Sequence, residues 1–257
     1  MAKWTAFPFA GEYDYDAASV KKNWTRLHVG DVEPLPKEAR LLEAWALYHS
    51  GAFQKAAEQG LKLGGAGITL ANKATCIYAT YLEPKERNRL DLFMDVAQRA
   101  EAQAAEDPKN ANAFYWQAYA LGRYSQGISV AKALAQGLGG KVKAALETAI
   151  KLQPKHADAH IALAAFHAEV IDKVGSLIGG MTYGAKKDTG LKLFQEALKL
   201  NPGSAIAMIE YANGMVMLDG DKKMKEATKL YEQAAAAQPL DAMERLDVEM
   251  AKEELAD

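Results

Sequence analysis

Prolines divide the second half of the chain into segments of similar design. They fall inside four short stretches, residues 107–111, 153–157, 201–205 and 238–242. A proline ends a helix because it has no amide hydrogen and its ring clashes with the preceding turn. Two residues after each proline stands a side chain that can cap the next helix, namely Asn110, His156, Ser204 and Asp241. The sequence therefore predicts a series of helices that stop and restart at these points.

Small and large side chains recur at fixed distances from these prolines. Five residues before three of them stands an alanine, and three residues earlier stands a large side chain. These alanines are Ala149, Ala197 and Ala234, and the large residues are Leu146, Phe194 and Tyr231. Small residues also recur in the first helix after each proline: Ala118, Ala164 and Ala212. A small side chain lets two helices approach closely, and large neighbours fill the remaining gap. The pattern predicts pairs of packed helices.

These offsets resemble the tetratricopeptide (TPR) repeat, in which an aromatic residue, an alanine and a closing proline recur along the second helix. The resemblance is strongest over residues 110–239, and residues 51–56, GAFQKA, are similar to the turn and second-helix start of an earlier repeat. It implies an all-α fold, a TPR-type helical-hairpin solenoid of about four to five hairpins. We expect residues 1–36 to form an N-terminal segment with one helix and a proline-containing linker, and residues 37–257 to form the solenoid.

The C-terminal residues have the pattern of a capping helix over residues 241–256. One apolar stripe is predicted to face the last hairpin, formed by Leu240, Met243, Leu246, Met250 and Leu255. Charged residues between them, Asp247 included, are expected to face water.

Two apolar inserts lengthen the third and fourth hairpins beyond the usual repeat of about 34 residues. They are residues 125–140 and 171–185, and each falls between the two helices of its hairpin. Their equivalent positions predict that they lie side by side at one edge of the stack. An apolar surface loop needs a covering surface. The inserts therefore either pack as extra core or form a lip or pocket for an apolar ligand or partner helix, with Leu177, Ile178 and Met181 as candidate contacts.

The second insert and its flanks carry a narrower resemblance. Residues 167–170, 177–184 and 191–202 together resemble the repeat domain of the regulator-of-microtubule-dynamics family. They are also distantly similar to the helical T component that accompanies periplasmic TRAP transporters. Both resemblances imply a binding solenoid without catalytic residues. Without a lipobox or signal in residues 1–257 we do not expect the transporter role, and without a membrane anchor there we do not expect a microtubule or organelle-tethering role.

TPR stacks bind extended ligands along the concave surface of their first helices. The resemblance places six candidate residues there: Tyr115, Tyr119, Arg123, Ile161, Ile209 and Asn213. The set lacks the Lys, Arg and Asn clamp of chaperone-binding repeats, and it suits an apolar segment with one acidic group. Two alternatives stay open, because the tyrosines can simply pack between repeats and Arg123 can pair with an acid such as Glu169.

Candidate catalytic and metal-binding residues do not form a convincing set. His156, His160 and His167 lie along one predicted helix face, which is where zinc ligands could be assembled. They occupy cap and packing positions of the repeat, so we predict no metal site. Cys76 lies in an apolar stretch and is expected to be a buried, inert thiol. No nucleophile and base can be paired, so we expect neither an enzyme nor a cofactor.

Charge and hydropathy limit the class of partner. The chain has 31 basic and 33 acidic residues, so it lacks the positive excess that nucleic acid binding needs. No apolar stretch reaches the roughly 20 residues of a transmembrane helix, and the N-terminus lacks the apolar core of a secretion signal. We expect a cytoplasmic scaffold that holds a protein or peptide segment. The alternative is a carrier or sensor of a small apolar or lipid-like ligand.

Overall fold

A computed structural model describes residues 3–256, and within that range the regular structure is entirely helical. The chain divides into two compact units, which are described one at a time. The first comprises the residues up to His28, Glu33–Leu152 and Asp241–Met243, and the second comprises Val29–Val32, Gln153–Leu240 and the residues from Glu244 onward. Among residues 3–256, no helix has the length and apolar character that crossing a bilayer requires.

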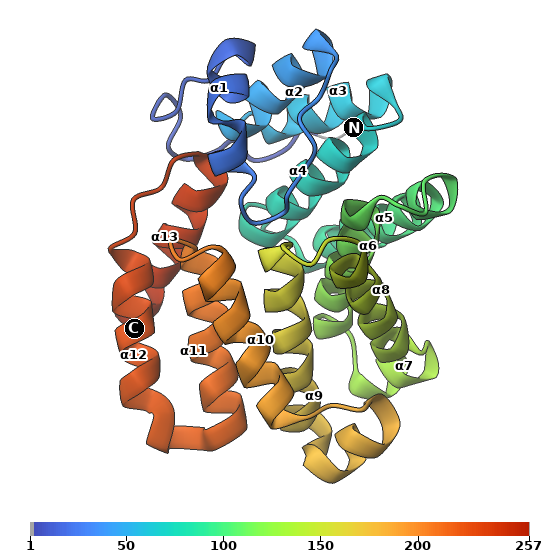
Figure 1. Cartoon of the computed structure of the whole chain (residues 1–257), viewed down its shortest axis with the longest axis vertical. Coiled ribbons are helices and arrows are strands. Elements are labelled where there is room, and N and C mark those ends of the chain that lie inside the picture. Colours follow the sequence, from blue (N-terminus) through green and yellow to red (C-terminus); the bar gives the residue numbers. More distant parts are fainter. Residues whose placement is uncertain (1–2, 257) are drawn as a thin grey trace. The chain divides into compact units, whose positions relative to one another are not determined.

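The first unit contains eight helices (Figure 1). They are α1 (Ala17–Leu27), α2 (Ala39–His49), α3 (Phe53–Leu63), α4 (Gly67–Tyr81), α5 (Glu86–Glu106), α6 (Ala111–Gln126), α7 (Val130–Ala135) and α8 (Leu138–Leu152). Helices α3, α4, α5 and α6 pack on one another in chain order, and α8 packs on α6. This order of neighbours is that of stacked helical hairpins. The one helix predicted within residues 1–36 is α1, and Asp16 caps it.

Helix α4 forms the centre of the first unit. Every residue from 69 to 79 is buried, Cys76 included. Its buried polar groups bond to α5: Arg99 Nε donates to Asn72 Oδ1 at 2.6 Å, and Gln103 Nε2 donates to Thr69 Oγ1 at 2.9 Å. These hydrogen bonds offset the cost of burying polar side chains.

A cluster of aromatic and imidazole rings packs where α1 and α2 meet. Trp45 is fully buried and meets Trp24 edge to face, with ring centroids 5.6 Å apart. His49 lies beside it, with its Nε2 atom 3.3 Å from Nε2 of His28. On its other side, His49 Nδ1 lies 2.6 Å from Oδ2 of Asp241, a residue 192 positions later in the chain. The cluster therefore depends on a contact between sequence segments that are far apart.

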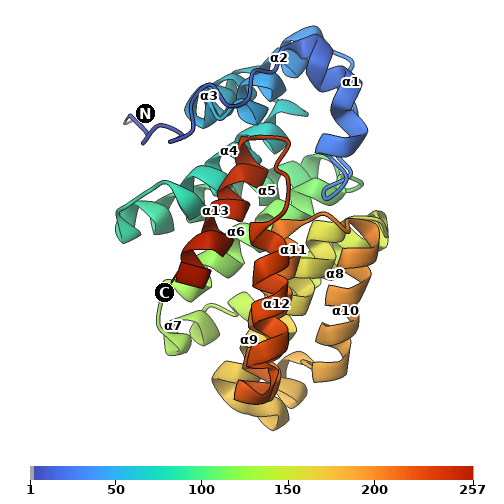
Figure 2. The same ribbon diagram turned by 90° about the vertical axis from the view of Figure 1, so that its left-hand side faces the viewer.

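The second unit contains α9 (Ala157–Tyr183), α10 (Lys187–Leu200), α11 (Ala205–Asp219), a 3₁₀ turn (Gly220–Lys223), α12 (Met224–Ala235) and most of α13 (Ala242–Ala256). Helix α9 packs on both α10 and α11, and α12 packs on α11. The four helices lie alongside one another (Figures 1 and 2). The buried Phe194 packs with Ala164 and Ala197, as the repeat pattern predicts. The second unit is a pair of TPR-type hairpins followed by a closing helix.

Three of the four predicted caps are confirmed. Amide groups at the third position after each cap donate to Asn110, His156 and Ser204, over 3.1, 3.1 and 3.2 Å. The fourth residue, Asp241, directs a carboxylate oxygen to His49. Proline-bounded restarts thus occur where the sequence predicts them.

Both inserts lie between the two helices of a hairpin, which confirms their placement in the third and fourth hairpins. The first contains α7, which follows α6 and packs on α8 (Figure 1). The second continues α9, and Gly175 breaks it with φ +80° and ψ 157°. That conformation is essentially restricted to glycine, so the break redirects the helical segment that follows. The side-by-side arrangement of the inserts stays a prediction.

The buried face of α13 differs from the predicted stripe. Leu240 and Leu255 are 39% and 41% exposed, whereas Asp247, expected in water, is only 4% exposed. Leu246, Asp247 and Val248 are buried in succession, and consecutive helical residues point about 100° apart. The prediction of a single stripe was therefore wrong, because α13 is buried over a wide arc. Val248 packs against Ile209, which is consistent with a closing role.

Candidate functional site

A groove of about 290 Å³ lies in the first unit where α4, α5 and α6 meet. It is formed by the C-terminal end of α4, the first turns of α5 and the C-terminal end of α6. Its polar lining comprises Thr80, Glu86, Arg89, Arg123 and Gln126. Leu90 and Phe93 add apolar surface. The groove is thus mixed in character, with two cations among its polar groups.

Neighbours on α4 and α6 position Arg123. Its Nη1 atom donates to Gln126 Oε1 at 3.3 Å, and its guanidinium lies 5.3 Å from the centre of the Tyr119 ring. The Tyr119 hydroxyl lies 2.9 Å from Thr80 Oγ1. Burial raises the pKa of Tyr119, although the charge of Arg123 opposes the shift. Tyr119 therefore stays a neutral hydroxyl that orients Arg123 through its ring face.

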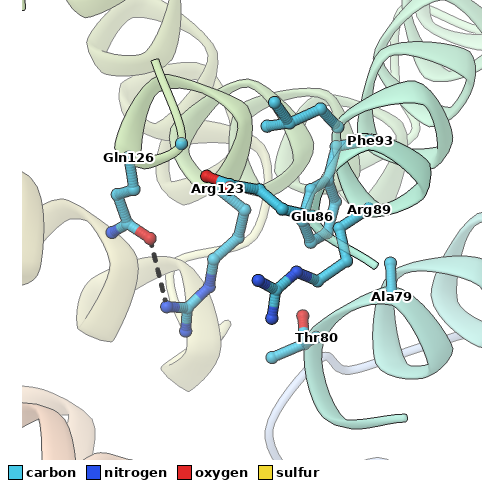
Figure 3. A pocket seen from close by; sticks show the side chains of 9 residues that line it. Ala79, Thr80, Glu86, Arg89, Phe93, Arg123 and Gln126 are labelled. Atoms are coloured by element: carbon cyan, nitrogen blue, oxygen red, sulfur yellow. Dashed lines mark hydrogen bonds between the residues drawn. The ribbon is translucent and has the colours of Figure 1, made fainter. Parts of the chain in front are cut away.

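Arg89 reaches the same groove from α5 and is partly buried. Within residues 3–256, its guanidinium makes no hydrogen bond or ion pair with another side chain. In Figure 3 the side chains of Arg89 and Arg123 point into a shared space, with Thr80 close to it. The groove therefore presents two guanidinium groups from different helices.

Four other residues predicted for the concave surface make contacts within the fold. Tyr115 is only 6% exposed and meets Trp116 edge to face, with centroids 4.8 Å apart. Ile161 and Ile209 are 5% and 2% exposed and belong to two apolar clusters of the second unit. Asn213 Oδ1 accepts a hydrogen bond from the Tyr231 hydroxyl at 2.6 Å. These contacts favour the packing interpretation for Tyr115, and they show that the other three side chains also have partners within the fold.

The candidate residues of the second insert are exposed. Leu177, Ile178 and Met181 have exposed fractions of 75%, 58% and 82%. They lie on the helical segment that follows the break at Gly175. Side chains this exposed do not form extra core, so the packing alternative does not apply to them.

The histidines of α9 have structural contacts. His156 caps the helix, and His160 Nδ1 lies 2.9 Å from the carbonyl oxygen of His156. His167 Nδ1 accepts from the backbone amide of Lys186 at 3.1 Å. The Nδ1 atom of each histidine is therefore used in a backbone contact of α9 or of the start of α10.

The sequence did not identify Arg89, Thr80 or Gln126 as site residues. Arg89 is one of several charged residues at the start of a long polar helix, and nothing in the local pattern separates it from its neighbours. Only the packing of α4, α5 and α6 brings these three residues to one groove. The sequence pointed to this groove only through Arg123, which the TPR resemblance places on the concave surface.

Comparisons with known proteins agree with this architecture. A crystal structure of a thermophilic TPR protein from Thermus thermophilus matches 83% of this chain and 97% of its own chain, with a TM-score of 0.57 and 16% identity. That likeness shows a common fold. Among curated proteins, none matches the chain. The family model described as regulator of microtubule dynamics protein 1-3 matches residues 65–257. That match covers well over half of the sequence, and the chain therefore belongs to the regulator of microtubule dynamics protein 1-3 family.

Proposed function

We propose that this protein is a non-catalytic scaffold that binds a segment of another protein through the second insert. The TPR-type fold supports a binding role, because stacked hairpins offer extended surfaces to partners. Family membership is consistent with that role and assigns no catalytic residue. A protein ligand also agrees with the balanced charge of the chain, which gives no electrostatic basis for binding nucleic acid.

The observation that carries the proposal is the exposure of Leu177, Ile178 and Met181. Three large apolar side chains within five residues give a compact apolar surface on one helical segment. Covering one such side chain contributes about 1.5–3 kcal/mol, so a partner that covers two of them gains appreciable affinity. Their exposure also favours surface contact with a partner helix over enclosure of a small ligand.

Photo-crosslinking identifies the partner, and calorimetry then tests the insert. A photoreactive amino acid at position 178 should link covalently to the bound chain, whose segment can be identified by mass spectrometry and synthesised. We expect the double variant Leu177→Ser, Met181→Ser to bind that segment at least about tenfold more weakly than the wild type, which corresponds to about 1.4 kcal/mol.

Leu35→Ser provides the matched control, because Leu35 is 45% exposed and lies in the first unit. It should leave the affinity unchanged. Equal affinity of the wild type and the double variant for the segment would rule out the insert as the binding surface. If native mass spectrometry instead found a retained lipid-like molecule, and position 178 captured no protein, the carrier function would replace the scaffold.

A further inference from the structure

Two guanidinium groups share the groove between α4, α5 and α6. Arg89 and Arg123 both line it and point into the same space (Figure 3). Like charges repel, so an anion between these groups stabilises the arrangement. We propose that the groove binds a phosphomonoester carried by a phosphorylated side chain of a protein partner. This inference rests on the proposed function, because it takes a protein segment as the ligand.

A phosphomonoester fits this charge pattern better than a carboxylate does. It carries a charge of about −1.5 to −2 and three acceptor oxygens, and each planar guanidinium can donate two parallel hydrogen bonds to it. Glu86 also lines the groove and opposes anion binding. Its side chain is exposed whereas both arginines are partly buried, so solvent screens its charge more effectively.

The other lining residues favour a peptide as the carrier of the phosphate. Thr80 and Gln126 have polar groups that can bond to a peptide backbone, and Leu90 and Phe93 offer apolar contact to a neighbouring side chain. Both arginines are partly buried in the groove, so a phosphate at the end of a side chain reaches them more readily than a flat membrane surface does. The groove volume of about 290 Å³ is sufficient for such a group.

Titration with N-acetyl-phosphoserine amide tests the site directly. The arginine Nε–H signals of Arg89 and Arg123 should shift in nuclear magnetic resonance spectra, with a dissociation constant on the order of 1 mM. Arg89→Ala should weaken binding at least about tenfold, since it removes one of the two bidentate donors. Arg123→Ala should have a similar effect. Arg87→Ala is the matched control, because Arg87 is exposed on the same helix and outside the groove, and it should bind like the wild type.

Several results would overturn the inference. One is identical titration of the wild type and Arg89→Ala, and another is equally tight binding of N-acetyl-glutamate amide. Co-flotation with phosphatidylcholine vesicles that contain phosphatidic acid, without any response to the phosphoserine probe, would also overturn it in favour of a lipid source.

The two proposals fail separately. The probe contains no protein segment, so its failure to bind refutes the phosphate site and leaves the insert proposal standing. The Leu177→Ser, Met181→Ser variant should titrate with the probe like the wild type. Loss of probe binding in that variant would contradict the assignment of the phosphate to the groove.

Discussion

Short-range hydrogen bonds hold two cap residues of this chain in place. Asn110 and Ser204 cap the helices that follow them, because a cap needs only the backbone within three residues of its own position. Ala164 and Ala197 are fully buried, as the repeat offsets predict. Tyr115 was less predictable, since its family position is the same whether the ring meets a ligand or packs against Trp116.

Cys76 provides a test at this scale. Its side chain is buried, and burial raises the pKa of the thiol well above its ordinary value. The reactive thiolate is therefore almost absent in the folded protein. We expect no reaction with a disulfide reagent at pH 8 in native conditions, and one equivalent of reaction in guanidinium chloride. Rapid reaction of the folded protein would show that α4 is accessible to solvent.

At the scale of helices, proline and alanine spacing predicted the helix restarts after Pro108, Pro154 and Pro202, whereas the buried face of α13 was not predicted. Helices α6, α9 and α11 each begin three residues after one of these prolines. The prediction of the buried face of α13 was wrong, because Asp247 and Val248 are both buried. A hydrophobic stripe identifies one contact surface, and it fails for a helix that is covered over a wide arc.

The contact between α3 and α4 yields a prediction about helix packing. A Cβ atom on Gly60 would lie 2.5 Å from the carbonyl oxygen of Gly67 and 3.0 Å from the amide nitrogen of Ala71. Backbone atoms cannot move far to relieve such a clash. Gly60→Ala should therefore lower the free energy of unfolding by about 1–3 kcal/mol, as measured by urea denaturation.

Gly122 offers the matched control inside α6, because nothing lies within 4 Å of a Cβ atom added there. Gly122→Ala should raise the free energy of unfolding by up to about 1 kcal/mol, since glycine is a poor helix former. A similar effect of both substitutions would mean that α3 and α4 are not in close contact.

For the whole molecule, the repeat class was predictable and the candidate groove was not. The repeat class follows from the fixed distances between prolines, alanines and large side chains, which recur along the chain. One repeat with a weak match does not hide this pattern. The groove needs Thr80, Arg89 and Arg123 from three helices, so it exists only after packing. The boundary proposed at residue 36 likewise depends on tertiary contacts and stays a prediction.

Removal of the C-terminal helix is expected to affect the entire protein. Deleting residues from 241 onward takes away the Asp241 partner of His49 and uncovers Ile209, which packs with Val248. Loss of a buried partner is costly because the remaining polar group stays desolvated. We expect a melting temperature lower by about 10 °C and aggregation in size-exclusion chromatography.

A shorter deletion after Lys252 is the control, since the described residues beyond it are exposed. It should leave the melting temperature nearly unchanged. Full solubility and unchanged melting of the longer deletion would show that α13 is dispensable for the fold.

The contact between His49 and Asp241 also sets an order on folding during synthesis. Domains usually begin to fold from the N-terminus while the chain is being made. Here the imidazole buried beside Trp45 cannot meet its carboxylate until residue 241 has left the ribosome. The first helices therefore lack this buried contact during most of translation. A pause or chain break late in synthesis should leave them exposed to chaperones and proteases.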